Sequence, residues 1–305
     1  MKPYALVPEC LSSPQAARAE PGIQIRGYDY MRIGLFVDGI PVYSIYDRQT
    51  DFSQFSTFDI SEISVSKGYT SPLYGMNTLG GAINLVTSKP KDKLEIRARY
   101  NFIPNNENQL AASVGSNMGK YYYQVSYAFS ERDSFNLSAS FTPTQFQPNK
   151  EAFNSHYKNH TLKAKIGFTP NQNHEYSLNF IFQKGSKGGL IDAVSGGRYW
   201  DWPNYDKYTL YLLGNSAFSE NLWLNTKIYW DHFYNNLTAQ GNLPVGSSPR
   251  RGFRGISIYA DHSLGVIETL SYAIDENKKL DRAKPALQLH LQPQLHAPKC
   301  LYQHR

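Results

Sequence analysis

Alternation of apolar and polar residues dominates the chain from about residue 93 to residue 274. The first such segment has apolar residues at Leu94, Ile96, Ala98, Tyr100 and Phe102. Because side chains alternate across a β-strand, this period predicts a strand with one apolar and one polar face. Seven further segments show it, at 109–117, 121–130, 157–168, 174–184, 207–218, 222–234 and 256–272. The pattern predicts about eight antiparallel strands, which fit a membrane barrel and a soluble sandwich alike.

The lengths of the connections distinguish these two architectures. Short connections fall at 118–119, 169–173 and 219–221, and long ones at 131–156, 185–206 and 235–255. Because short and long connections alternate, the long ones are expected at one end of the sheet, which is typical of an outer-membrane barrel. Within a long connection, residues 185–189 and 199–202 are candidates for capturing a ligand, and the alternative is a mobile surface.

Residues 22–90 predict a compact mixed-sheet domain. Short apolar strands stand beside glycines expected at turns or close crossings, namely Gly27, Gly39, Gly68, Gly75, Gly80 and Gly81. Asp38 and Gly39 form a hairpin signal, since both residues tolerate left-handed backbone conformations. A phosphate-binding loop is excluded, because Gly81 and Ala82 stand where lysine and a hydroxyl residue are needed. Between 47 and 59, the phenylalanines Phe52, Phe55 and Phe58 fit either core anchors or a helical stripe.

Composition excludes several classes of protein. No apolar run of about eighteen residues is present, which argues against a transmembrane helix, and the 23 tyrosines suit aromatic girdles at membrane interfaces. The net charge of +6 comes from scattered lysines and arginines, so we expect no nucleic-acid partner.

Candidate chemistry is sparse. Cys10 and Cys300 predict neither a disulfide framework nor a metal cluster, and His156 and His160 are interpreted as solvated. Without a G-x-S-x-G nucleophile motif, we expect no enzyme, no catalytic or metal-binding residue and no cofactor. The sequence does not identify ligand-contacting residues.

Residues 60–87 read I-x-x-I-x-V-x-K-G-x-x-S-x-L-Y-G-x-x-x-L-G-G-x-I-N-L-V-T. This string resembles the end of the plug domain of TonB-dependent outer-membrane receptors, and residues 23–28 and 32–41 are similar to two further plug strands. The resemblance covers residues 22–272. It implies a plug inside a barrel of roughly 22 strands, located in the bacterial outer membrane. It also implies the TonB energy-coupling complex, membrane lipid and a ferric siderophore, cobalamin or similar small ligand as partners.

The resemblance implies a fragment of such a receptor with a mainly β fold, in which a partial plug precedes an incomplete antiparallel transmembrane β-barrel of about eight strands. The expected divisions are an atypical segment 1–20, the plug at 21–92, the barrel at 93–274 and an atypical tail at 275–305. No signal peptide or TonB box is readable, so we expect the chain as written not to transport. The alternatives are a small outer-membrane barrel with an adhesive or structural role, and a barrel-embedded hydrolase, which lacks a nucleophile signature.

Overall fold

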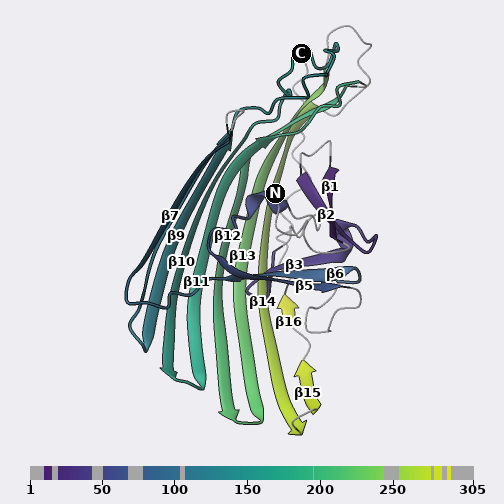
Figure 1. Cartoon of the computed structure of the whole chain (residues 1–305). Coiled ribbons are helices and arrows are strands. Elements are labelled where there is room, and N and C mark those ends of the chain that lie inside the picture. Colours follow the sequence, from purple (N-terminus) through teal and green to yellow (C-terminus); the bar gives the residue numbers. More distant parts are fainter. Residues whose placement is uncertain are drawn as a thin grey trace.

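A tall antiparallel sheet curves around a small N-terminal domain, which lies on its concave side (Figure 1). The computed structural model describes residues 10–15, 20–42, 51–67, 78–103, 107–194, 196–243, 254–275, 278–283 and 287–289. We call the large sheet, β7 to β16, the wall.

The wall strands pair in chain order, each antiparallel to its neighbours. They are β7 (Glu95–Ile103), β8 (Glu107–Asn117), β9 (Tyr121–Arg132), β10 (Tyr157–Asn171), β11 (His174–Gly188), β12 (Gly197–Ser219), β13 (Leu222–Leu243) and β14 (Arg254–Asp275). The mainly β fold and the eight long strands predicted from the alternation are confirmed. Two short strands from the last part of the chain, β15 (Lys278–Ala283) and β16 (Leu287–Leu289), also pair with β14.

The long connections do gather at one end of the wall, but two of them were predicted too long. β11 continues to Gly188, β12 begins at Gly197 and β13 runs to Leu243. Most of 185–206 and much of 235–255 are therefore strand. Apolar alternation fades there while strand pairing continues. The strand bounds also leave a short connection between β7 and β8 at this end, at 104–106, outside the described residues.

The N-terminal domain contains the predicted mixed sheet. Its order is β4 (Ile40–Pro41), β3 (Ile33–Val37), β6 (Gly81–Thr87), β5 (Ile60–Lys67), with β3 and β6 parallel. A separate hairpin joins β1 (Cys10–Gln15) to β2 (Glu20–Ile25). Two short 3-10 helices, η3 (Tyr30–Arg32) and η4 (Phe52–Gln54), complete the domain.

Two positions show why glycine is needed here. Gly39 has φ +77°, and with Asp38 at φ 52° it closes the predicted β3–β4 hairpin. Gly81 has φ +145°, and a Cβ there would lie 2.5 Å from the carbonyl oxygen of Ser66 on β5. Gly27 also has positive φ, and Gly80 packs against Tyr28. Gly68 and Gly75 lie outside the described residues.

The phenylalanines of the 47–59 segment serve as anchors. Phe52 is buried in the core and Phe55 packs against it. The helical alternative fails, because η4 covers only three residues. Phe58 lies under the guanidinium groups of Arg97 and Arg99.

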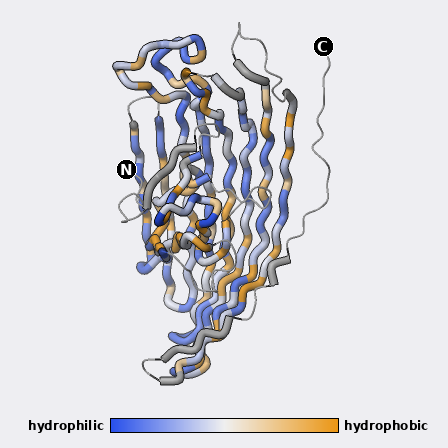
Figure 2. Tube along the Cα trace, turned by 90° about the vertical axis from the view of Figure 1, so that its right-hand side faces the viewer, coloured by the Kyte–Doolittle hydropathy of each residue, from blue (hydrophilic) through white to orange (hydrophobic). Residues whose placement is uncertain are grey.

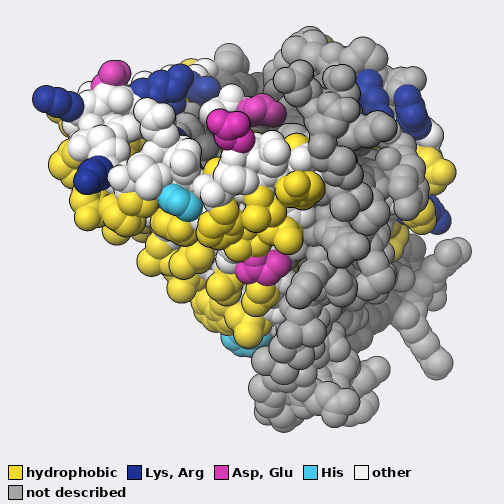
Figure 3. Space-filling view, turned by 90° about the horizontal axis from the view of Figure 1, so that it is seen from below, with side chains coloured by type: hydrophobic (Ala, Val, Ile, Leu, Met, Phe, Trp, Pro, Cys, Tyr) yellow, Lys and Arg dark blue, Asp and Glu magenta, His cyan; other side chains and the backbone are white. Residues whose placement is uncertain are grey.

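The wall has a polar inner face and an apolar outer face. On β9, Tyr122, Gln124 and Ser126 are buried against the N-terminal domain, whereas Tyr123 and Val125 point outward and are exposed. Hydrophobic positions are concentrated in the lower part of the long strands in Figure 2. Seen from the end with the short turns, hydrophobic side chains form a band along one margin of the molecule (Figure 3). No helix in the described part of the chain is long and apolar enough to cross a membrane.

Candidate functional site

The N-terminal domain contacts the wall first through a hydrophobic layer. Ile83 and Leu85 of β6 belong to a buried cluster that includes Ile181, Tyr211 and Tyr229 of the wall. Because these wall residues lie on three strands, β11, β12 and β13, the layer fixes the height of the four-stranded sheet along the wall. Around this layer lie the polar contacts that form the candidate site.

Asp38 joins three segments of the molecule. Its carboxylate accepts hydrogen bonds from the backbone N–H of Thr87 at 2.7 Å, from the Thr87 hydroxyl at 2.7 Å and from the Tyr211 hydroxyl at 2.8 Å. The ammonium of Lys227 packs directly against Gly39, the next residue. The hairpin turn of the N-terminal domain is thereby held to its last strand and to β12 and β13 of the wall.

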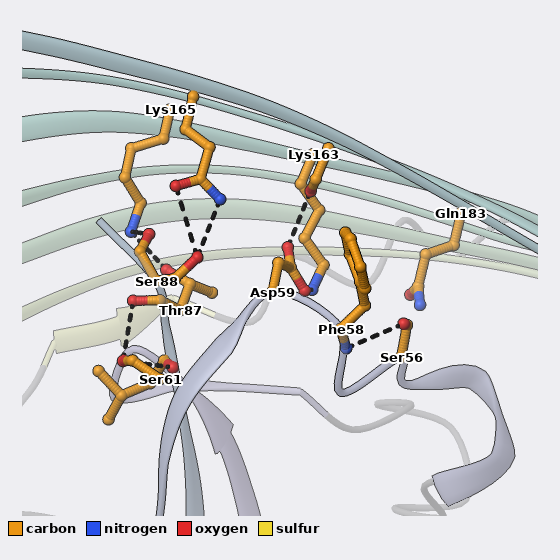
Figure 4. Close-up of polar contacts among 12 residues, drawn as sticks. Ser56, Phe58, Asp59, Ser61, Thr87, Ser88, Lys163, Lys165 and Gln183 are labelled. Atoms are coloured by element: carbon orange, nitrogen blue, oxygen red, sulfur yellow. Dashed lines mark hydrogen bonds and ion pairs between the residues drawn. The ribbon is translucent and has the colours of Figure 1, made fainter. Parts of the chain in front are cut away.

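A second group surrounds Asp59, which is 4% exposed (Figure 4). Lys163 Nζ lies 2.7 Å from its carboxylate, and the Ser126 hydroxyl donates to it at 2.9 Å. Breaking a buried ion pair of this kind by removing one partner costs about 3–5 kcal/mol, because the other charge stays desolvated. The carboxylate of Asp59 therefore holds the N-terminal domain to β9 and β10 of the wall.

The exit from β6 is held next to this group. Lys165 donates to the Thr87 hydroxyl and to the carbonyl of Ser88 (Figure 4). Gln124 Nε2 donates to the Ser88 hydroxyl at 2.9 Å. Immediately after, Lys89 pairs with Glu175 at 2.7 Å. The wall thus binds three consecutive residues at the point where the chain leaves the N-terminal domain.

A small cavity of about 20 Å³ separates the two parts beside these contacts. It is lined by residues of both, among them Asp59, Thr87, Lys165 and Asn179. The Oδ1 atom of Asn179 has no hydrogen-bond partner, and the residue is only 2% exposed. Asn179 is thus a buried polar residue at the boundary between the domain and the wall, and its side-chain oxygen accepts no hydrogen bond from the described residues.

Lys187 forms a separate attachment nearer the long connections. Its ammonium lies 2.6 Å from Glu20 and 2.8 Å from Asp51, and all three side chains are buried. The rings of Trp202 and Tyr205 cover it at 5.0 and 4.4 Å from their centroids. Two carboxylates from distant parts of the N-terminal domain therefore meet on one lysine of β11.

Residues 6–82 match the family model described as TonB-dependent Receptor Plug Domain. This match assigns the N-terminal part of the chain to the plug domain of TonB-dependent receptors. The plug motifs described in the sequence begin at residue 22, and the match begins earlier, at residue 6. The N-terminal domain of the structure is therefore the plug.

Solved receptors share the fold of plug and wall. The chain is similar to the copper transporter OprC, with 16% identity and a TM-score of 0.74, over 90% of this chain and 40% of that one. It is similar to the FrpB iron transporter from Neisseria meningitidis, with 15% identity and a TM-score of 0.69, over 90% and 43%. It is also similar to the siderophore receptor PirA from Acinetobacter baumannii, with 15% identity and a TM-score of 0.65, over 90% of this chain and 43% of that one. The chain thus spans about two fifths of the length of these receptors.

TonB-dependent receptors are transporters and not enzymes. Within the described ranges, no group of three or more His, Cys, Asp or Glu residues is placed to hold a metal ion. The two histidines interpreted as solvated are both partly exposed, and each also has a partner in the wall. His156 contacts Asp201 at 3.1 Å, and His160 shares a 2.7 Å hydrogen bond with Tyr127.

The proposed ligand-capturing segments are placed differently from the prediction. Lys187, from 185–189, is buried against Glu20 and Asp51 of the plug. Trp202, from 199–202, is buried in a cluster with Tyr205 and Phe233 of the wall. Neither residue is displayed in a loop. The plug contacts of Lys163, Lys165 and Lys187 were missed, because an inward lysine and a solvated one look alike in an alternating pattern. The sequence does contain one indication of these contacts. The three lysines occupy the strand positions that alternate with the apolar residues, so their side chains point to the face opposite the apolar one.

Proposed function

We propose that this chain supplies the plug and part of the barrel wall of an outer-membrane receptor that imports a scarce ligand, such as a ferric siderophore or cobalamin. The observation that carries the proposal is the seating of the plug sheet on the concave polar face of the wall through Asp38, Asp59 and Lys187. A plug held by polar contacts to a lumen face obstructs a passage and can be rearranged. We retain 21–92 and 93–274 as the proposed extents of plug and wall.

The outer face of the wall supports placement in a bilayer. On β10, Phe168 stacks on Tyr121 with ring centroids 4.9 Å apart, and His160 packs on Phe129 at 4.8 Å. The eight residue-to-residue steps from His160 to Phe168 span about 26 Å along a strand. Between them Ile166 is exposed. Two aromatic layers about this far apart are typical of the apolar band of an outer-membrane barrel.

We further infer that uptake needs additional strands. In the described part of the chain, β7 pairs only with β8, and beyond β14 only the short strands β15 and β16 pair. An open sheet does not enclose a passage, and unpaired backbone groups in hydrocarbon cost several kcal/mol each. The energy-coupling partner that this proposal requires is the TonB complex, acting on the plug from the side of the short turns.

Uptake measurements test the proposal. The complete gene region that encodes this sequence is expressed in a receptor-deleted strain, with and without TonB, under iron, copper or cobalamin limitation. We expect TonB-dependent uptake of a labelled ligand from the complete region. Failure with every ligand would contradict the receptor assignment.

The 305-residue chain with an added export signal is the second arm of this experiment. We expect it to reach the outer membrane without restoring uptake. Uptake by this chain alone would contradict the inference that further strands are needed. An adhesive or structural role for a small barrel predicts no ligand uptake in either arm.

A further inference from the structure

Two histidines lie side by side on the outer face of the wall, one on β13 and one on β14. His232 and His262 are direct partners in the pairing register of these strands. Their rings stack, with centroids 4.1 Å apart and planes inclined by 19°. Both side chains are partly exposed, and they share this face with the exposed residues Trp230 and Leu264. We call His232 and His262 the histidine pair.

The ring of His232 is oriented by the backbone of the opposite strand. Its Nδ1 atom lies 3.0 Å from the carbonyl oxygen of Asp261. Because a carbonyl can only accept a hydrogen bond, Nδ1 carries the hydrogen, and Nε2 of the neutral ring has a free lone pair. Histidines that bind metal ions almost always donate their other N–H to a carbonyl or carboxylate in this way. The contact with Asp261 therefore prepares Nε2 of His232 as a ligand.

The spacing of the two rings suits a shared ion. Bonds between a metal ion and imidazole are about 2 Å long, so two nitrogens on one ion lie about 3–4 Å apart. The ring centroids of the histidine pair are already 4.1 Å apart. Since rotation of an imidazole about its Cβ–Cγ bond is soft, a small turn of either ring lets a nitrogen from each face the same ion.

Aromatic rings surround the histidine pair. Trp230 stacks on His232 at 6.2 Å and on His262 at 6.0 Å between centroids. Tyr208 stacks on His232 at 5.8 Å and packs on Phe182 in turn. A belt of rings at a membrane boundary accounts for the aromatic character of these positions. It does not account for nitrogen at two directly opposed positions, which any other aromatic ring could occupy.

We propose that the histidine pair is a binding site for a divalent transition-metal ion, such as Cu²⁺, Ni²⁺ or Zn²⁺, which bridges β13 and β14. Imidazole suits these ions, whereas Ca²⁺ and Mg²⁺ favour oxygen ligands. Water molecules complete the coordination, because the described residues place no third His, Cys, Asp or Glu at the pair. The proposal does not rest on the receptor function.

The position of the site on β14 gives the bridge a structural effect. Among the described residues, β15 and β16 pair with β14 only from Leu264 to Asp275. His262 lies two residues before this stretch, where β14 is paired with β13. An ion that binds both strands binds only the paired state, so it stabilises that pairing in proportion to its saturation.

Binding of Cu²⁺ to the full chain in detergent micelles tests the proposal. His290, His296 and His304 lie outside the described residues, and all three are replaced by Gln in every protein of the experiment, including the parent. We expect one bound Cu²⁺ whose electron paramagnetic resonance spectrum shows coupling to two imidazole nitrogens. At a free Cu²⁺ concentration about 100 times the Kd, hydrogen exchange of β13 and β14 beside the pair should slow by up to about 100-fold.

His262→Phe keeps a stacked ring and removes one nitrogen. It should weaken Cu²⁺ binding at least about ten-fold and abolish the slowing of exchange by Cu²⁺. His160→Phe makes the same change at a single outward histidine on β10 and should leave both measurements unaltered.

Three results would overturn the proposal. They are equal losses from the two variants, unchanged binding in His262→Phe, and a parent spectrum with fewer than two imidazole nitrogens. If His262→Phe does not fold, the parent protein decides the question. Two-nitrogen coupling together with slowed exchange confined to β13 and β14 would support the site, and slowed exchange elsewhere would refute it.

Discussion

The hydroxyl of Tyr211 donates a 2.8 Å hydrogen bond to the carboxylate of Asp38, although 173 positions separate the two residues in the chain. One lies in the hairpin turn of the plug and the other in the middle of β12. Because Asp38 also binds Thr87, this contact ties the C-terminal ends of both strands of the plug's parallel pair, β3 and β6, to the wall.

Tyr211→Phe removes only the hydroxyl that reaches Asp38. A charge-assisted hydrogen bond of this kind contributes about 1.5–3 kcal/mol, so we expect a loss of that size in the free energy of plug unseating. Urea titration followed by hydrogen exchange of β3 and β6 measures it. Tyr208→Phe on the outer face of the same strand is the control and should leave plug exchange unaltered.

Gly81→Ala should unseat the plug sheet far more than Gly119→Ala. Both glycines have positive φ, which costs an alanine about 1–2 kcal/mol. At Gly81 the new Cβ also meets the Ser66 carbonyl, whereas at Gly119 nothing lies within 4 Å. Thermal unfolding of both variants gives the comparison. Similar losses would mean that backbone strain, and not the close approach of β5, explains this glycine.

Lys187→Met should release β2 and η4 from the wall. The substitution leaves Glu20 and Asp51 buried beside an apolar side chain, and removing one partner of such a group costs about 3–5 kcal/mol. Adding Glu20→Gln and Asp51→Asn should recover part of that loss. Hydrogen exchange of residues 20–25 and 51–54 is the measurement, and Lys184→Met, outward on the same strand, should have no effect on it.

Leu178→Arg should impair membrane assembly. Leu178 is half exposed near the middle of the outer face, where an arginine costs about 2–4 kcal/mol. His160→Arg lies at the aromatic layer and should cost about 0–1 kcal/mol. Folding into lipid vesicles, followed by protease protection, distinguishes them. Equal yields would indicate that this face of the wall does not contact lipid.

The strands and the glycine turns depend on residues within the same segment, so the sequence predicts them. An alternating period specifies a strand such as β9 without knowledge of its neighbours, and Asp38–Gly39 specifies its own hairpin. The contacts between the plug and the wall depend instead on residues that are far apart in the sequence. Lys187 meets Glu20 and Asp51 at separations of 167 and 136 residues. Only the curvature of the wall and the height of the plug bring them together.

The same reason explains the misplaced loops. Residues 185–188 and 199–206 lack apolar alternation, which fits the proposed membrane placement if the outer faces of β11 and β12 extend beyond the hydrocarbon there. Backbone pairing continues regardless, as the pair Lys187–Trp202 shows. A hydropathy pattern reports the surroundings of a strand and not its length.

The exit from β6 has a kinetic consequence. Only residues 88–94 connect β6 to β7, and Ser88 and Lys89 are themselves bound to the wall. A displaced plug therefore remains tethered beside its seat, at an effective concentration on the order of millimolar. Return of such a plug would be a first-order event, so under the receptor function proposed above each molecule would reset on its own, at a rate independent of how many molecules the membrane holds.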